Sequence, residues 1–322
     1  MELLVGVDEA GYGPNLGPLV VSATVWRSDH DRLSDRWSER LAPHVVPASA
    51  AARHAATSVV MDDSKRLYQP ARGVGLLERG VLAAIWCSGL RVESSSQLWA
   101  TLDPAGASER RSLPWYAAHD CRLPQSPTAV DLPQVAERMS TGLRSCGVEI
   151  VQLASVAVEP AHWNQLLQKW GSKGTVLTQV SLQLVRQVID PWRGVPIRVV
   201  CDKHGGRNCY AAALQHVFPE TRIQVGTEGR ASSHYSWGEP GAERRIQFRS
   251  GGEAFLPTAL ASMTSKYLRE LAMQAFNRFW QAHQPQLRPT AGYPVDARRF
   301  KAEIAPLQSA LGISDQMVWR ER

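Results

Sequence analysis

Two adjacent carboxylates end the first apolar run of the chain. Asp8 and Glu9 follow residues 3–7, and a glycine-rich segment with Gly11 and Gly13 begins two residues later. Neighbouring side chains of a regular strand point to opposite faces, so these acids converge only where the strand ends or kinks. Glycine supplies the backbone freedom for such a kink. Because adjacent carboxylates repel each other, a fold that gathers them usually supplies a cation, most simply a hard divalent metal ion.

Two further acids lie at positions that suit the same site. Asp202 ends a later apolar run, and Glu270 lies inside the long helical pattern 255–281. Glu270 shares one helix face with Lys266 and Ser262. The small apolar residues of this helix indicate close packing against a sheet, where a carboxylate must meet water, a counter-charge or a metal. Taken alone, Asp202 is equally well interpreted as a loop or cap residue, and Glu270 is better interpreted as a solvated surface acid.

The composition is that of an ordinary globular protein. The chain has 322 residues, 44% of them hydrophobic, and its net charge of +6 is compatible with a polyanionic partner without proving one. The five cysteines are scattered without a Cys-x-x-Cys pair, so neither a zinc site nor a disulfide framework is indicated. No apolar run approaches the ~20 residues of a membrane helix, and acids near the N-terminus argue against a signal peptide. We therefore expect a cytoplasmic protein without membrane attachment.

Apolar periodicity predicts strands with helices between them. We expect strands over residues 3–7, 17–26, 148–157, 196–201 and 246–248. We expect helices over residues 73–88, 174–188, 255–281 and 300–311. The first two strands, joined by the glycine turn, should form an antiparallel hairpin. Strands first and helices interleaved indicate an α/β or α+β sheet domain.

Taken together, these residues resemble the signature of type 2 ribonuclease H, the ribonuclease HII/HIII group. Residues 6–20 resemble its Gly-x-Asp-Glu-Ala-Gly-x-Gly-Pro-x-x-Gly-Pro-Leu-Val motif, and residues 63–67 its Asp-Ser-Lys-Lys-Leu segment. The strand that ends at Asp202 resembles the one that carries the family's third acid. Residues 261–270 resemble its Ala-Ser-x-x-Ala-Lys-x-x-Arg-Asp helix, and residues 292–294 its Gly-Tyr-Gly/Pro stretch. The motifs occur in the family's order and span nearly the whole chain.

The resemblance implies an α/β fold with a ribonuclease H-like mixed sheet flanked by helices. It implies one catalytic domain, residues 1–322, in which a C-terminal helical part from about 276 to 322 caps the substrate face. The length in excess of a typical member lies in three peripheral insertions, at about 27–57, 96–130 and 219–244. We expect the protein to be a monomer.

The resemblance also implies a function. The protein would be an endoribonuclease that cleaves the RNA strand of RNA–DNA hybrids and leaves 5′-phosphate and 3′-hydroxyl ends; DNA with embedded ribonucleotides is a further candidate substrate. Two Mg²⁺ or Mn²⁺ ions would be held by Asp8, Glu9, Asp202 and Glu270. Asp8 would bridge both ions, Asp202 would complete the nucleophile site, and Glu9 and Glu270 would serve the leaving group. The implied substrate-binding residues are Gly11, Tyr12, Gly13, Ser64, Lys65, Lys266 and Tyr293.

Three departures from the family pattern affect these expectations. Tyr12 replaces the arginine of the Gly-Arg-Gly turn that is implied to read the ribose 2′-hydroxyl at an RNA–DNA junction. We therefore expect weak discrimination for a single embedded ribonucleotide and relatively better cleavage of longer hybrid tracts. Glu270 stands where ribonuclease HII has aspartate, and Lys203-His204 stand where the family usually has Gly-Asn.

Two alternatives remain open at this point. An actin-like or sugar-kinase-type ATPase shares the fold, but it would need a second phosphate-binding glycine hairpin. A catalytically silent hybrid-binding protein is the other hypothesis, and the presence of all four acids argues against it.

Overall fold

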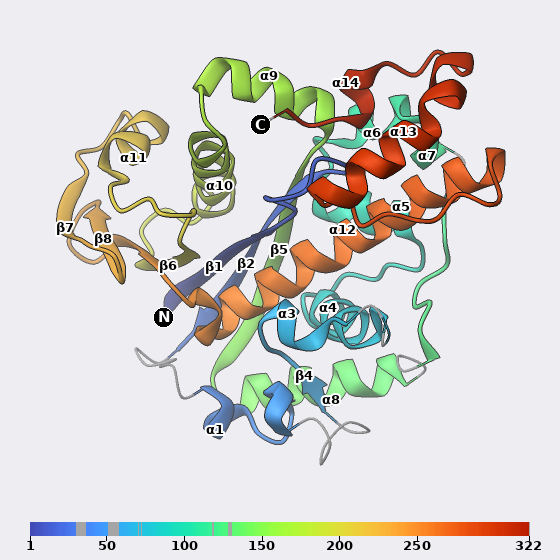
Figure 1. Ribbon diagram of the computed structural model, residues 1–322. Coiled ribbons are helices and arrows are strands. Elements are labelled where there is room, and N and C mark those ends of the chain that lie inside the picture. The colour runs from blue at the N-terminus through green and yellow to red at the C-terminus, as the bar shows by residue number, and fades with distance from the viewer. Residues whose placement is uncertain are drawn as a thin grey trace.

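A seven-stranded mixed sheet forms the centre of the computed structural model, which describes residues 1–29, 37–50, 58–69, 71, 73–117, 119–127 and 131–321. The sheet has the strand order β5-β2-β1-β6-β9-β8-β7 (Figure 1). Its strands are β1 (Glu2–Ala10), β2 (Leu19–Ser28), β5 (Val148–Val158), β6 (Ile197–Asp202), β7 (Gln224–Glu228), β8 (Ser232–Trp237) and β9 (Arg244–Arg249). Much of the predicted insertion 27–57 lies outside the described residues.

The strand directions agree with the predicted hairpin. β1 is antiparallel to β2 over its whole length, with Asp8 opposite Ser22, and it is parallel to β6. β2 also pairs with β5, and β9 is parallel to β6. β7 and β8 were not predicted as strands; they form an antiparallel extension beyond β9, and the side chains of β7 are exposed throughout. A separate parallel pair, β3 (Val45–Val46) and β4 (Val59–Val60), lies outside this sheet.

Helices cover both faces of the sheet, which confirms the predicted α/β class. The longer ones are α4 (Gly75–Cys87), α5 (Ser95–Leu102), α8 (Leu132–Ser145), α9 (Pro160–Trp170), α10 (Lys173–Ile189), α11 (Ala211–Val217), α12 (Leu256–His283) and α13 (Pro294–Ala310). The shorter ones are α1 (Trp37–Leu41), η1 (Ala48–Ala50), α3 (Ser64–Leu67), α6 (Ala107–Ser112), α7 (Pro114–Ala117), η3 (Gly252–Ala254) and α14 (Asp315–Val318). None of the described helices is long and apolar enough to cross a membrane.

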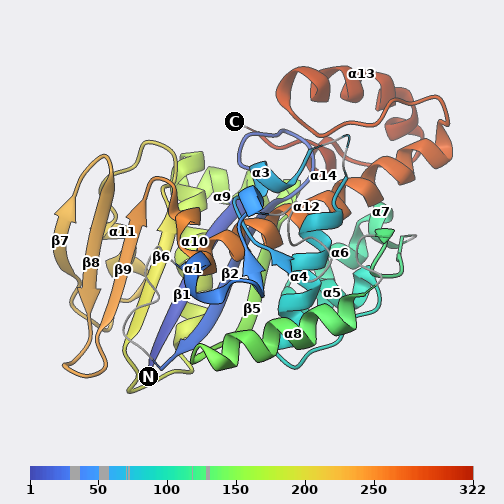
Figure 2. The same cartoon turned by 90° about the horizontal axis from the view of Figure 1, so that it is seen from below.

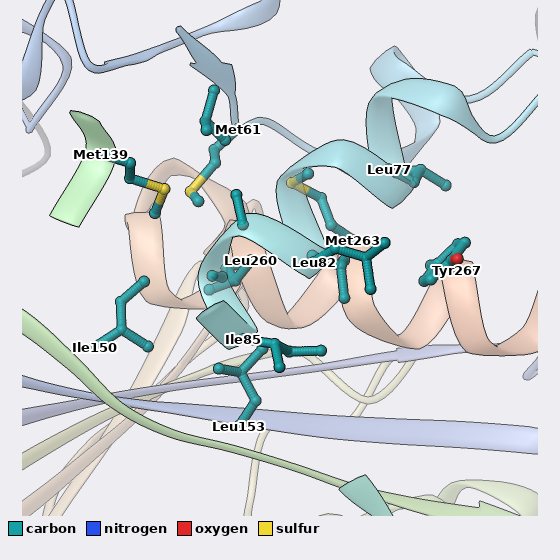
Figure 3. Packing of buried hydrophobic residues seen from close by; sticks show 14 of the residues in the cluster. Met61, Leu77, Leu82, Ile85, Met139, Ile150, Leu153, Leu260, Met263 and Tyr267 are labelled. Atoms are coloured by element: carbon teal, nitrogen blue, oxygen red, sulfur yellow. The ribbon is translucent and has the colours of Figure 1, made fainter. Parts of the chain in front are cut away.

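The two faces of β1 contribute to different cores because successive side chains alternate. Leu4 packs with α4, α8 and α12, where Leu82, Ile85 and Met263 interdigitate (Figure 3). Leu3, Val5 and Val7 pack with α10 on the opposite face. Figure 2 shows the sheet between these two helical layers. β1 is therefore fixed from both sides, and so is the position of the acids at its end.

The long helix α12 confirms the predicted helical pattern and extends past the sheet. Its distal half carries Phe276 and Trp280, which pack with Phe300 of α13 in a third core. α13 begins at Pro294, six residues earlier than predicted, because proline is well suited to the first turn of a helix. The predicted irregular region near residues 104–127 contains the short helices α6 and α7.

Candidate active site

The parallel pairing of β1 and β6 brings the first three acids to one edge of the sheet. Val7 lies opposite Cys201, so Asp8 and Glu9 lie beside Asp202, the last residue of β6. A Cβ on Gly6 would lie 2.0 Å from backbone atoms of Pro257 and Thr258. Gly6 is therefore required for the direct backbone contact between β1 and the start of α12.

This contact places two α12 hydroxyls on Asp8, which is buried. Ser262 is hydrogen-bonded to the Asp8 carboxylate, and Ser265 Oγ donates to the Asp8 carbonyl at 3.0 Å. Ser262 Oγ also lies 3.0 Å from Ser64 Oγ, within hydrogen-bond distance, which ties α3 to the same point. The predicted site residue Ser64 thus supports the acids by way of Ser262.

The acids destabilise one another in their charged forms. Burial and the charge of Glu9 raise the pKa of Asp8 well above its usual value, and Glu253 and Asp202 add to the rise. Burial, followed by the charge of Asp202, raises the pKa of Glu9 to about 7, while Lys65 acts in the opposite direction. Such mutual shifts indicate a group of carboxylates within electrostatic reach of one another.

Glu253 belongs to this group, although sequence analysis did not single it out. It lies in the one-turn helix η3, directly after Gly252, whose N–H donates to Asp202 Oδ1 at 3.1 Å. Burial and the charges of Asp202 and Asp63 raise the pKa of Glu253, and Lys65 Nζ lies 3.9 Å from its Oε1. The available signal was the glycine pair directly before this acid, shortly after the predicted strand 246–248.

Glu270 has partners of its own. It forms an ion pair with Lys266 at 2.5 Å and accepts a hydrogen bond from the Tyr68 hydroxyl at 2.9 Å. Lys266 Nζ also lies 4.1 Å from the centre of the Tyr68 ring. Glu253, and not Glu270, is among the groups that most raise the pKa values of Asp8 and Glu9, and Lys266 balances the charge of Glu270.

The predicted glycine-rich turn is held in a conformation that requires glycine. Gly11 and Gly17 have φ values of 89° and 74°. A Cβ on Gly11 would lie 2.5 Å from Arg269 Nε, and one on Gly17 would lie 2.3 Å from Met273 Sδ. The turn from Gly11 to Gly17 is thus packed tightly against α12.

The remaining predicted substrate residues surround this turn. Burial and the charge of Glu9 raise the pKa of Tyr12, and Arg207 opposes the rise. Arg207 was not predicted; it follows β6, is half-buried and donates to Thr175 Oγ1 at 3.0 Å. Tyr293 is 56% exposed, and its Cε1 lies 3.9 Å from the place of a Cβ on Gly13. An exposed aromatic ring and a cation therefore flank the turn.

Lys203 and His204, which depart from the family pattern, have structural partners. Lys203 Nζ donates to Asn208 Oδ1 at 2.7 Å and to the carbonyls of Arg207 and Gly229. Burial lowers the pKa of His204 to about 3, and its Nδ1 lies 3.1 Å from Thr178 Oγ1. Both side chains stabilise the loop after β6.

The side chains of the acidic group suit a hard divalent cation, although they lie further apart than the ligands of a bound metal ion. Among the described residues, no three His, Cys, Asp or Glu side chains are grouped closely enough to hold a metal ion. The four carboxylates Asp8, Glu9, Asp202 and Glu253 are nevertheless hard oxygen donors. Three of them have raised pKa values that a bound cation would lower. The residues present fit a divalent cation in chemistry.

Comparisons with known proteins give structural likeness only. No family model matches the chain, and no curated protein sequence matches it. Similar solved structures include ribonuclease HII in its complex with PCNA from Archaeoglobus fulgidus, with 13% identity and a TM-score of 0.45 over 99% of this chain and 94% of that one. Ribonuclease H2 from Pyrococcus horikoshii OT3 has 14% identity and a TM-score of 0.42 over 98% of this chain and 92% of that one. A Bst-RNase HIII structure in complex with Mn²⁺ has 13% identity and a TM-score of 0.47; 99% of this chain and 65% of that one are covered. At these identities and scores, function has to be inferred from the residues of the site.

Proposed function

We propose that this protein is a divalent-metal-dependent endoribonuclease that cleaves the RNA strand of RNA–DNA hybrids, and that it is a divergent type 2 ribonuclease H. One observation carries the proposal: Asp8, Glu9, Asp202 and Glu253 gather at the ends of β1 and β6, beside a glycine-rich turn. Four buried or half-buried acids in electrostatic reach of one another, three of them with raised pKa values, are costly in a fold that has no use for them.

The chemistry that suits these residues is phosphodiester hydrolysis. Divalent Mg²⁺ or Mn²⁺ ions, two per site, would supply an activated water and stabilise the leaving oxygen. Asp8, Glu9, Asp202 and Glu253 would hold the ions, and Glu253 replaces Glu270 in the set expected from the sequence. Water adds to phosphorus, the bond to the 3′-oxygen breaks, and that oxygen takes a proton. The products are a 5′-phosphate and a 3′-hydroxyl.

The residues around the acids suit a hybrid substrate. Gly11, Tyr12 and Gly13 form a turn whose backbone can approach a minor groove closely, where ribose 2′-hydroxyls both donate and accept hydrogen bonds. Exposed Tyr293 can pack on a sugar, and Lys65 is positioned beside the acids to contact a phosphate. Lys266 is held by Glu270, so its contact with substrate requires that this pair open.

We further infer how the chain works as a whole. Residues 1–322 act as one catalytic domain and as a monomer in the cytoplasm, and the helices from about residue 276 lie beside the bound substrate. The segments near 96–130 and 219–244 are peripheral to the reaction.

A cleavage assay with matched substrates tests the proposal. Labelled RNA–DNA hybrid, DNA duplex with one ribonucleotide, and plain DNA duplex are incubated with Mg²⁺, Mn²⁺ or EDTA. We expect metal-dependent cuts in the hybrid's RNA strand and none in plain DNA. Hybrid binding without cleavage under any metal condition would support the silent binding protein, and ATP hydrolysis without cleavage would support the ATPase.

A further inference from the structure

The segment Trp319–Glu321 is tied to the glycine-rich turn, far from it in sequence. Arg320 N donates to the Asn15 carbonyl at 2.8 Å, and Asn15 Nδ2 donates back to the Arg320 carbonyl at 2.9 Å. Leu16 and Trp319 form an antiparallel bridge beside this pair. The two segments therefore behave locally as a short two-stranded ribbon.

Helix α9 holds the other side of the same segment. Asn164 Nδ2 donates to the Trp319 carbonyl at 2.9 Å, and Glu321 N donates to Asn164 Oδ1 at 2.8 Å. Trp163 Nε1 donates to the Glu321 carbonyl at 3.0 Å. These bonds fix the backbone on both sides of Arg320 and so fix the direction of its side chain.

The Arg320 side chain is 1% exposed and reaches the backbone of the turn. Its Nη2 donates to the Tyr12 carbonyl at 3.3 Å, and its Nη1 lies 3.5 Å from the Gly17 carbonyl. Arg269 of α12, which is 3% exposed, donates from Nη2 to the Leu16 carbonyl at 3.1 Å. Two buried guanidinium groups thus bind three carbonyls of one turn.

This arrangement buries two cations at a desolvation cost, which their hydrogen bonds and the Trp163 ring, whose centre lies 4.4 Å from Arg320 Cζ, offset in part. Neither Arg269 Nε nor Arg320 Nε has a hydrogen-bond partner among the described residues. Burial and the nearby charge of Arg269 lower the pKa of Arg320 to about 9, and Glu159 only partly compensates. Replacing buried charges by apolar residues of similar size is often neutral or stabilising, so stability alone does not account for these arginines.

The bound carbonyl determines what the turn presents to its surroundings. A peptide unit is planar and trans, so the Tyr12 carbonyl and the Gly13 N–H point in opposite directions. With the carbonyl directed at Arg320, the Gly13 N–H points away from it. Gly13 is exposed, and its N–H has no acceptor among the described residues. The turn therefore offers a free backbone donor beside Tyr293.

We infer that Arg320 is a positioning residue for substrate binding: together with Arg269 it holds the turn so that the Gly13 N–H and the Tyr12 side chain face the nucleic acid. The Gly13 N–H then donates to an oxygen of the bound strand. This inference rests on the proposed function for its substrate, but the effect on the turn itself does not depend on it.

Arg320→Met, Arg320→Lys and the control Arg138→Met test the inference; Arg138 is exposed on α8. Arg320→Met should raise KM for the hybrid roughly tenfold with little change in kcat, because it removes the hydrogen bonds that orient a binding group. Its melting temperature should fall by no more than about 4 °C, roughly the shift that 1 kcal/mol gives in a chain of this size. Arg320→Lys keeps one charged donor and should recover part of the affinity, while Arg138→Met should match the wild type.

Hydrogen exchange of the free protein supplies a readout without substrate. In Arg320→Met, amides over residues 11–17 should exchange faster while those of β1 keep wild-type protection. Unchanged exchange in the turn together with unchanged KM would overturn the inference. A melting temperature that drops by more than about 4 °C in both Arg320 variants, with exchange faster throughout, would also overturn it, because Arg320 would then be merely structural. A wild type that cleaves nothing would refute the proposed function, whereas faster exchange confined to the turn would still support the positioning role.

Discussion

Paired substitutions of Glu253 and Glu270 separate the two candidates for the fourth acid. Glu→Gln keeps the shape of the side chain and removes its charge, so each variant is the matched control of the other. Glu253→Gln should reduce hybrid cleavage by more than ~10²-fold, which corresponds to about 2.7 kcal/mol of transition-state stabilisation. The reason is its place in the acidic group, within electrostatic reach of Asp8, Glu9 and Asp202.

Glu270→Gln should have a much smaller effect. It breaks the ion pair with Lys266, whose two side chains are each about one-fifth exposed, and leaves the Tyr68 hydroxyl an amide oxygen to bond. A partly exposed ion pair of this kind contributes about 1 kcal/mol to stability. Its loss should therefore change the rate of hybrid cleavage less than about tenfold. The freed Lys266 could even strengthen binding to a phosphate backbone.

Single-turnover cleavage of one labelled hybrid, with saturating enzyme and either Mg²⁺ or Mn²⁺, measures both effects without interference from product release. Hybrid affinity in EDTA should persist or increase in Glu253→Gln, because one charge that repels phosphate is gone. The reasoning is refuted if Glu270→Gln loses more activity than Glu253→Gln, because the fourth acid would then be the one that the sequence pattern indicated.

Three further outcomes are expected. Asp8→Asn or Asp202→Asn should each reduce cleavage by more than ~10²-fold while hybrid binding persists; substantial activity in either variant would contradict the metal site. Burial and Asp202 raise the pKa of Glu9 to about 7, so its protonated form stabilises the fold below about pH 4.5 and this contribution is lost as the pH rises through 7. In EDTA, the free energy of unfolding of wild type relative to Glu9→Gln should therefore fall between pH 5 and 8 by on the order of 1–3 kcal/mol, measured by urea denaturation, and a flat difference would contradict the shift. Tyr12→Arg should raise cleavage at a single ribonucleotide relative to the hybrid; a wild-type preference for the single ribonucleotide that Tyr12→Arg leaves unchanged would show that another element reads the junction.

The sequence allowed the central elements and three of the acids to be predicted for a clear physical reason. Apolar runs define β1 and β6, and acids that end two adjacent parallel strands must meet at one edge of the sheet. The hairpin of β1 and β2 followed from the glycines between them. By contrast, β7 was not predicted because it exposes all its side chains, and β8 was not predicted because only two of its alternating buried residues, Tyr235 and Trp237, are hydrophobic.

The choice between two candidates for the fourth acid shows a limit of helical periodicity. Ser262 and Glu270 do share one face of α12, as predicted, but eight residues also separate them by ~12 Å along the axis. Two residues on the same helix face therefore do not necessarily belong to the same site. Glu253 was missed because η3 is a single turn with no periodicity of its own. Its position depends on how the chain passes from β9 to α12, which only the tertiary structure defines.

The distribution of charge around the glycine-rich turn connects these observations. Carboxylates lie on the strand before the turn, and the guanidinium groups of Arg269 and Arg320 lie against the turn itself. A fold selected only for stability would pair the two sets, but here the arginines bind backbone carbonyls, and the acids keep their raised pKa values. The acids are therefore left with negative charge that bound cations would neutralise. Under the proposed function, metal ions neutralise the acids while the turn, held by the arginines, contacts the strand that is cut. Loss of the acids should then impair the chemical step, and loss of the arginines should impair substrate binding.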